Sequence, residues 1–129
     1  MKLGFIGTGK ITESVVTGIS SSKIKYSKIL VSPRNLYIAK KLSKKNKNVS
    51  IGKSNQEIIN SCDWIFLAVT PTVGEKIIKT LKFKSNQTII SFISTITLPS
   101  LKKLINVKAK IFRSIQLPQI SLRKGQVPV

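Results

Sequence analysis

Short apolar runs alternate with longer amphipathic runs along this chain of 129 residues. Runs that are almost entirely apolar predict buried strands, and apolar residues spaced three and four positions apart predict helices. The predicted strands cover residues 3–6, 29–31, 49–51, 64–69, 88–93 and 110–115. The predicted helices cover residues 10–20, 35–46, 55–61, 73–81 and 98–105. This alternation predicts a three-layer α/β fold with a six-stranded, mainly parallel sheet and right-handed crossovers.

The same pattern predicts one domain over residues 1–115, which contains all of the expected strands. Residues 116–129 hold two prolines and one glycine and have no clear apolar period, so we interpret them as a tail or linker. The chain stops soon after the sixth predicted strand. We therefore expect a complete minimal α/β domain with no second domain behind it.

Composition limits the classes of protein and of site. A hydrophobic fraction of 41% and a charged fraction of 21% are typical of globular proteins. No apolar run reaches the roughly 18 residues of a membrane span, and glycines interrupt the first apolar run, so we expect a cytoplasmic protein without a signal peptide. One cysteine allows no internal disulfide. The absence of histidine, with only four acidic residues, argues against a catalytic zinc or paired-carboxylate site.

The net charge of +19 has two interpretations. It could indicate a nucleic-acid or membrane-surface partner, or it could reflect a compositional bias toward lysine. We favour the bias, because surfaces that read bases and clamp phosphates usually use more arginine and these lysines are spread along the chain. A basic nucleic-acid-binding module remains the alternative class. In either case the charge attracts anionic ligands over long range.

The first chemical motif is Gly7-Thr8-Gly9, between the first predicted strand and the first predicted helix. Glycine at the first position permits a tight turn, and glycine at the second lets a pyrophosphate approach the backbone. Free N–H groups at the helix start then bind the phosphates. The third position of this motif is usually glycine or alanine, and here it is Thr12, for which space is short. An ordinary glycine turn is the alternative, but the position favours a dinucleotide-binding domain of the Rossmann kind.

The second motif, Ser32-Pro33-Arg34-Asn35, follows the second predicted strand. NAD sites normally carry an acidic residue there to bind the ribose 2′-hydroxyl, but no acidic residue lies between Glu13 and Glu57. Ser32 and Arg34 instead offer a hydroxyl and a planar guanidinium, which suit a 2′-phosphate. The motif therefore predicts NADPH rather than NADH, although a solvated arginine in a helix-start turn would look the same.

A third stretch, Ala68-Val69-Thr70-Pro71, ends the fourth predicted strand. Ligands of open α/β sheets bind at the carboxyl ends of the strands, so this stretch is a candidate wall of the cofactor site. A buried strand and its stop would explain the apolar residues equally well. Only the position indicates a function.

Together the segments GFIGTGKITESVVTG, SPRN, SNQEI, FLAVTP and FRSIQLPQISLRKG resemble the amino-terminal domain of pyrroline-5-carboxylate reductases. The resemblance implies NADPH-dependent reduction of a cyclic imine carboxylate in proline synthesis. It places the pyrophosphate at Gly7, Thr8, Gly9, Lys10 and Ile11, the 2′-phosphate at Ser32, Arg34 and Asn35, and the adenosine ribose at Asn55. It places Ala68, Val69, Thr70, Pro71 and Ser94 along the cofactor toward its nicotinamide end. Thr70 departs from the family, which often has lysine there.

Family members also carry a helical carboxyl-terminal domain that dimerises and builds the substrate pocket, and this sequence has no counterpart of it. We therefore expect the chain to be inactive, or nearly so, by itself, and we identify no catalytic residue. Pyrroline-5-carboxylate is the candidate substrate. We expect self-association through apolar surface in the SIQLPQI segment. A non-catalytic, cofactor-sensing fragment is a further alternative.

Overall fold

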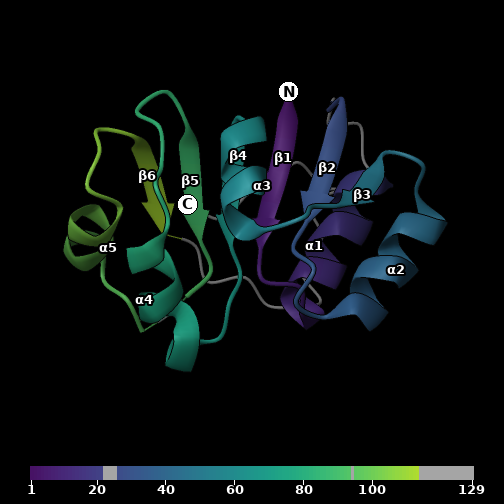
Figure 1. Ribbon diagram of the computed structural model, residues 1–129, viewed down its shortest axis with the longest axis horizontal. Coiled ribbons are helices and arrows are strands. Elements are labelled where there is room, and N and C mark those ends of the chain that lie inside the picture. The colour runs from purple at the N-terminus through teal and green to yellow at the C-terminus, as the bar shows by residue number, and fades with distance from the viewer. Residues whose placement is uncertain (22–25, 94, 114–129) are drawn as a thin grey trace.

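The computed structural model describes residues 1–21, 26–93 and 95–113 (Figure 1). Six strands form one sheet in the order β3-β2-β1-β4-β5-β6, and every pairing is parallel. The strands are β1 (Lys2–Ile6), β2 (Lys28–Val31), β3 (Val49–Ile51), β4 (Trp64–Leu67), β5 (Thr88–Ser91) and β6 (Lys110–Arg113). The helices are α1 (Lys10–Ser20), α2 (Leu36–Lys45), α3 (Asn55–Ser61), α4 (Pro71–Thr80) and α5 (Leu98–Ile105). The predicted α/β Rossmann fold is confirmed.

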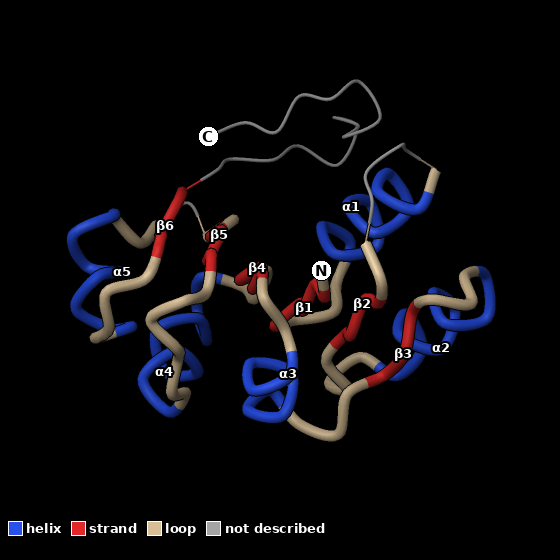
Figure 2. Tube along the Cα trace, turned by 90° about the horizontal axis from the view of Figure 1, so that it is seen from above, coloured by secondary structure: helices blue, strands red, loops and turns tan. Residues whose placement is uncertain are grey.

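Two hydrophobic clusters lie on opposite faces of the sheet. Helices α1 and α2 contribute Val16 and Leu42 to the cluster on one face, and α3, α4 and α5 supply the other cluster. Figure 2 shows α1 on one side of the strands and α3 and α4 on the other. Helices on both faces bury β1 from Leu3 onward and β4 from Ile65 onward, which explains why these two strands are almost entirely apolar.

Side chains of β1 and β4 alternate between the two clusters. Phe5 and Phe66 are register partners and stack with their ring centroids 4.5 Å apart. Their neighbours Ile6 and Leu67 point to the opposite face and are fully buried. The stacked rings fix β1 against β4 at the centre of the sheet.

The strand order places a topological switch point beside β1. This strand has β2 on one side and β4 on the other, and the chain leaves β1 and β4 toward helices on opposite faces. Crevices at such switch points, outside the carboxyl ends of the strands, are where open α/β sheets bind ligands. The fold therefore points to the turns that follow β1, β2 and β4.

Several predicted boundaries need correction. The strand predicted over 64–69 ends at Leu67, and the strand predicted over 88–93 ends at Ser91. In both cases one more N–H continues the ladder, from Ala68 to the Ile6 carbonyl at 2.8 Å and from Phe92 to the Leu67 carbonyl at 2.9 Å, before the chain turns away.

The predicted start of the fourth helix at residue 73 also needs correction, because α4 begins at Pro71. Proline is tolerated in the first turn of a helix, where its missing N–H would have no intrahelical partner. The end of the predicted strand 110–115, the tail at 116–129 and the SIQLPQI segment lie outside the described residues beyond Arg113.

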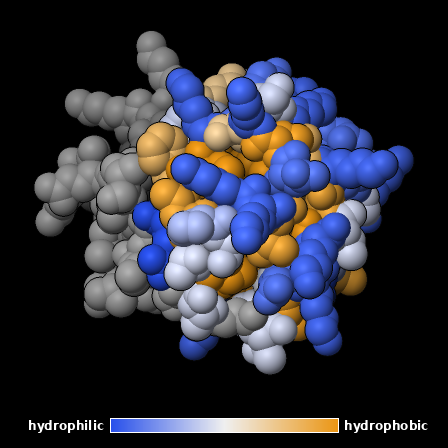
Figure 3. Space-filling model, turned by 90° about the vertical axis from the view of Figure 1, so that its left-hand side faces the viewer, coloured by the Kyte–Doolittle hydropathy of each residue, from blue (hydrophilic) through white to orange (hydrophobic). Residues whose placement is uncertain are grey.

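The lysines are distributed over both ends of the sheet. At one end of the sheet, the lysines of α2 are exposed. At the other end, α4 and α5 carry the exposed residues Lys76, Lys79, Lys102 and Lys103. Figure 3 shows hydrophilic residues (blue) projecting from a hydrophobic surface (orange) on the side that carries α4 and α5. Among the described residues, the positive charge does not gather in one strip.

No helix among the described residues is long and apolar enough to cross a membrane. Within the same part of the chain, no three potential metal-ligating side chains of the histidine, cysteine, aspartate and glutamate types come together.

Candidate functional site

A cleft of about 240 Å³ opens at the carboxyl edge of the sheet, where β1, β2 and β4 end. Its walls come from three turns that are far apart in the sequence. The lining residues are Gly7, Thr8, Gly9, Arg34, Asn35, Ala68, Val69, Thr70 and Val73. The structure thus brings together eight of the site residues expected from the sequence.

The Gly7 backbone closes the turn after β1 in a conformation that favours glycine. Its φ angle is +96°, and a Cβ atom there would lie 2.7 Å from the Ala68 carbonyl oxygen. Both sides of the residue are held by buried hydroxyls: its N–H donates to Ser32 Oγ at 3.2 Å, and its carbonyl accepts from Thr12 Oγ1 at 2.6 Å. The turn is therefore fixed before any ligand arrives.

Thr12 fits where the motif usually has glycine or alanine. The Thr12 side chain is fully buried, and its hydroxyl donates a hydrogen bond to the Gly7 carbonyl in the turn. The hydroxyl is a specific feature that the spacing of the glycines does not reveal. This hydrogen bond makes Thr12 part of the structure that fixes the turn.

Gly9 is the N-cap of α1 and has an extended backbone, with φ −128° and ψ −159°. The first hydrogen bond of the helix runs from the Glu13 N–H to the Gly9 carbonyl at 2.9 Å. The N–H groups of Gly9, Lys10, Ile11 and Thr12 come before this bond and lack partners within the helix. They lie at the positive end of the helix dipole, which favours an anion.

The space in front of this helix start fits a dinucleotide pyrophosphate. A Cβ atom added at Gly9 would meet no atom within 4 Å, although Gly9 itself lines the cleft. A phosphate group can therefore approach the backbone closely at this point. Lys10 is exposed and Ile11 half-buried, and neither side chain belongs to the cleft wall, so their expected contribution is limited to their amides.

Ser32 occupies a different position from the one expected. The sequence suggested a hydroxyl facing a 2′-phosphate, but the residue is only 1% exposed and does not line the cleft. Its Oγ lies 2.8 Å from Thr8 Oγ1, and Thr8 Oγ1 also donates to the Ser32 carbonyl at 2.6 Å. Ser32 is thus bonded to the underside of the glycine turn.

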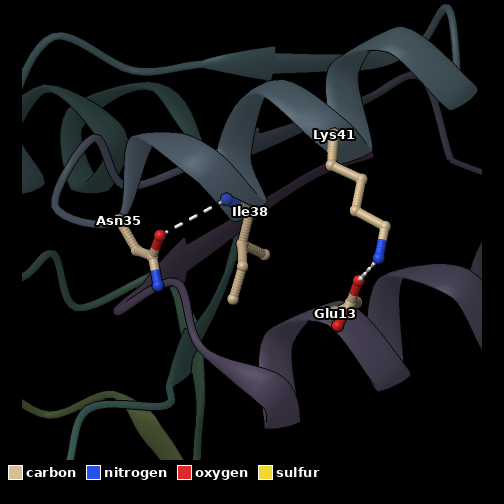
Figure 4. A network of polar contacts seen from close by, with 4 residues as sticks. All are labelled: Glu13, Asn35, Ile38 and Lys41. Atoms are coloured by element: carbon tan, nitrogen blue, oxygen red, sulfur yellow. Dashed lines mark hydrogen bonds and ion pairs between the residues drawn. The ribbon is translucent and has the colours of Figure 1, made fainter.

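Arg34 and Asn35 lie at the mouth of the cleft and are exposed. The Asn35 Oδ1 atom accepts from the Ile38 N–H at 3.3 Å and caps α2, as Figure 4 shows. This use of the oxygen leaves the Asn35 amide nitrogen for a ligand. Among the described residues of the lining, the Arg34 guanidinium is the single cation.

An ion pair crosses from α1 to α2 beside this motif. Lys41 Nζ lies 2.9 Å from Glu13 Oε2 (Figure 4), and this contact raises the pKa of Lys41. Glu13 is the acidic residue closest in sequence to the glycine turn. The lysine offsets its charge, so no unpaired carboxylate of α1 opposes an anion at the cleft.

The third wall is the turn from β4 to α4, formed by Ala68, Val69 and Thr70. Val73 also lines the cleft and was not predicted as a site residue, because the sequence pattern placed the start of this helix at residue 73. Since α4 begins at Pro71, Val73 belongs to its first turn and faces the carboxyl edge of the sheet. A proline directly after a strand is the signal that could have shown this.

Three further predicted residues are not placed at the cleft, and of these Pro71 is placed only by its backbone, as the first residue of α4. Asn55 begins α3, after the Ser54 cap, and is outside the lining. Ser94 lies outside the described residues. The proposed contact of Asn55 with a ribose remains a prediction.

Comparison with known proteins identifies relatives of this arrangement. The family model described as NADP oxidoreductase coenzyme F420-dependent matches residues 2–95. The pyrroline-5-carboxylate reductase 3 of Danio rerio is 30% identical over 116 residues, which are 88% of this chain and 40% of that protein. The chain therefore spans less than half the length of this relative.

Solved structures give the same result. The 1-pyrroline-5-carboxylate reductase of Streptococcus pyogenes matches with a TM-score of 0.66 and 28% identity, over 81% of this chain and 38% of that one. The pyrroline carboxylate reductase of Plasmodium falciparum, solved with NADP bound, matches with a TM-score of 0.71 and 25% identity, over 87% of this chain and 41% of that one. The chain therefore belongs to the NADP oxidoreductase coenzyme F420-dependent family, as a domain related to the amino-terminal, NADP-binding domain of pyrroline-5-carboxylate reductases.

Proposed function

We propose that this chain binds NADPH in the cleft at the ends of β1, β2 and β4. The observation that carries the proposal is the helix start at Gly9, where four amides precede the first helical hydrogen bond and an added Cβ would meet no atom within 4 Å. The pyrophosphate would bind to the amides of residues 9–12, which offer hydrogen bonds and the positive end of the helix dipole. The excess of positive charge on the whole chain adds long-range attraction for this anion.

The preference for NADPH over NADH would come from Arg34. A carboxylate at the end of β2 would bind a ribose 2′-hydroxyl and repel a 2′-phosphate, but none of the described lining residues is acidic. The exposed guanidinium of Arg34 and the amide nitrogen of Asn35 are donors that suit phosphate oxygens. The bound NADP of the Plasmodium falciparum relative supports the same cofactor class.

The reaction that we propose for the complete site is reduction of a cyclic imine carboxylate such as pyrroline-5-carboxylate. NADPH would supply the hydride. The residues of this chain would orient the cofactor: the turn and helix start would hold its pyrophosphate, and the wall from Ala68 to Thr70 would exclude water along one side. The described residues form one side of such a pocket, so substrate would have to be positioned by groups beyond them.

The test is titration calorimetry with NADPH and NADH. The wild-type chain should bind NADPH more tightly than NADH. Arg34→Ala should lose roughly 1.5–3 kcal/mol of NADPH binding, about 10- to 150-fold in Kd, with little change for NADH. Lys44→Ala, in the last turn of α2, removes the same charge away from the cleft and is the matched control.

Equal affinity of the wild type for the two cofactors, or a preference that survives in Arg34→Ala, would overturn the assignment. The same samples should be titrated with a DNA duplex at two salt concentrations. Binding of the duplex that falls steeply with salt, without any binding of NADPH, would favour the nucleic-acid module instead. Stoichiometric NADPH binding without turnover in any assembled state would favour a cofactor sensor.

A further inference from the structure

Three hydroxyl and amide groups link the end of β2 to the glycine turn. The Gly7 N–H lies 3.2 Å from Ser32 Oγ, Ser32 Oγ lies 2.8 Å from Thr8 Oγ1, and Thr8 Oγ1 lies 2.6 Å from the Ser32 carbonyl oxygen. All of these contacts are buried. They connect the segment expected to bind the 2′-phosphate with the segment expected to bind the pyrophosphate.

The direction of each hydrogen bond follows from counting hydrogens. A hydroxyl carries one hydrogen, and a carbonyl oxygen can only accept. The hydrogen of Thr8 is therefore used on the Ser32 carbonyl, so in the contact between the two hydroxyls Ser32 must be the donor. The Gly7 N–H then donates to Ser32 Oγ, and the chain of bonds runs in one direction from Gly7 through Ser32 and Thr8.

This count leaves Ser32 with no hydrogen for a ligand. The oxygens of an ionised phosphate are acceptors, so a serine hydroxyl can bind one only by donating. To donate to a phosphate, the Ser32 hydroxyl would have to break its hydrogen bond to Thr8 Oγ1. The side chain would also have to leave its buried position, where the residue is only 1% exposed. Burial and bonding together oppose a direct contact with the 2′-phosphate.

We propose that Ser32 is a positioning residue, which fixes the Gly7–Thr8 turn for the pyrophosphate and does not select the 2′-phosphate. The inference rests on the proposed binding of NADPH. It separates two roles within one short motif: Arg34, two residues further along and exposed in the cleft, sets the preference for NADPH, whereas Ser32 sets the geometry that every dinucleotide needs. Thr8 is its partner in that role.

The test compares three ligands by calorimetry: NADPH, NADH and 2′-AMP, which carries the 2′-phosphate but no pyrophosphate. Ser32→Ala should weaken NADPH and NADH by the same factor, roughly 3- to 10-fold for one neutral hydrogen bond, and leave 2′-AMP unchanged. Thr8→Val removes the other hydroxyl and should behave alike. Thr8→Ser keeps that hydroxyl and should retain wild-type affinities.

A loss confined to NADPH and 2′-AMP in Ser32→Ala, with NADH unchanged, would show that Ser32 contacts the 2′-phosphate and would overturn the inference. A second measurement needs no ligand: hydrogen exchange of the Gly7 amide should accelerate in Ser32→Ala and stay unchanged in Arg34→Ala. Unchanged Gly7 exchange in Ser32→Ala would also overturn the inference. Failure of the wild type to bind NADPH would refute the proposed function, while the exchange experiment would still decide the role of Ser32.

Discussion

Replacing Gly9 by alanine should weaken cofactor binding strongly without unfolding the domain. The backbone of Gly9 is extended, which alanine adopts freely, and the new methyl group would meet no atom within 4 Å. At such a position the loss of glycine stabilises by about 0.4–1 kcal/mol through the unfolded chain. Alanine is a poorer N-cap than glycine, which costs a similar amount. We therefore expect a change in the free energy of unfolding of less than about 1 kcal/mol.

The effect of Gly9→Ala on binding should be much larger than its effect on folding. The methyl group would occupy the space in front of the amides of residues 9–12, where the pyrophosphate must come within hydrogen-bond distance. Loss of one charge-assisted hydrogen bond costs about 1.5–3 kcal/mol, or roughly 10- to 150-fold in Kd. NADPH and NADH should lose affinity equally, because they share this group.

Gly7→Ala is the contrasting variant. Its φ of +96° and the 2.7 Å approach to the Ala68 carbonyl should destabilise the fold itself. Urea denaturation and calorimetry on both variants separate the two outcomes. If folded Gly9→Ala binds NADPH within threefold of the wild type, the pyrophosphate does not approach α1 as we have reasoned.

Further predictions concern the buried hydroxyl, the thiol and the reaction. Thr12→Val should lower the free energy of unfolding by about 1–3 kcal/mol, because the Gly7 carbonyl loses its 2.6 Å donor; urea denaturation measures this. Burial raises the pKa of Cys62 to about 11, from an ordinary 9.0, so the thiol should resist disulfide reagents at pH 8 until urea unfolds the chain. Since the folded thiol keeps its proton longer than the unfolded one, stability present below pH 9 should decline between pH 9 and 11 in the wild type but less in Cys62→Ala. The purified 129-residue chain should oxidise NADPH with pyrroline-5-carboxylate far below the typical enzyme rate of about 10 per second, because nothing in the described cleft positions the imine; turnover near that rate would contradict this.

The apolar periodicity was sufficient to predict the order and type of every element, because strands buried on both faces and one-sided helices have distinct patterns. The bounds of α1, β3, α3 and α5 agree with those predicted from the sequence. The errors discussed above lie at the ends of β4 and β5. At Val69 and Ile93 apolar residues continue past the last ladder hydrogen bond, because they line the cleft or the core without being paired as strands.

The candidate site was predictable as far as its backbone is concerned. Glycine spacing located the turn, and the lack of an acidic residue after β2 singled out Arg34. The orientation of Ser32 was not predictable, because a serine at the end of a strand can face the ligand or the protein, and its partner Thr8 decides between them. The role of Thr12 depended on a contact with a carbonyl, which no side-chain pattern encodes.

The seam between β1 and β4 links cofactor binding to folding. These strands are register partners although Leu3 and Trp64 are far apart in the sequence, and the cleft exists only once they are paired. A partly folded chain with β1, β2 and β3 alone would have the glycine turn and Arg34 but not the wall at Val69. A ligand that binds only the completed sheet stabilises it by mass action, by about 2.7 kcal/mol at a concentration of 100 times Kd. NADPH would thus stabilise the paired state of the half that contains β1, β2 and β3 and the half that contains β4, β5 and β6. The unfolding of the two halves should become more cooperative as the NADPH concentration rises.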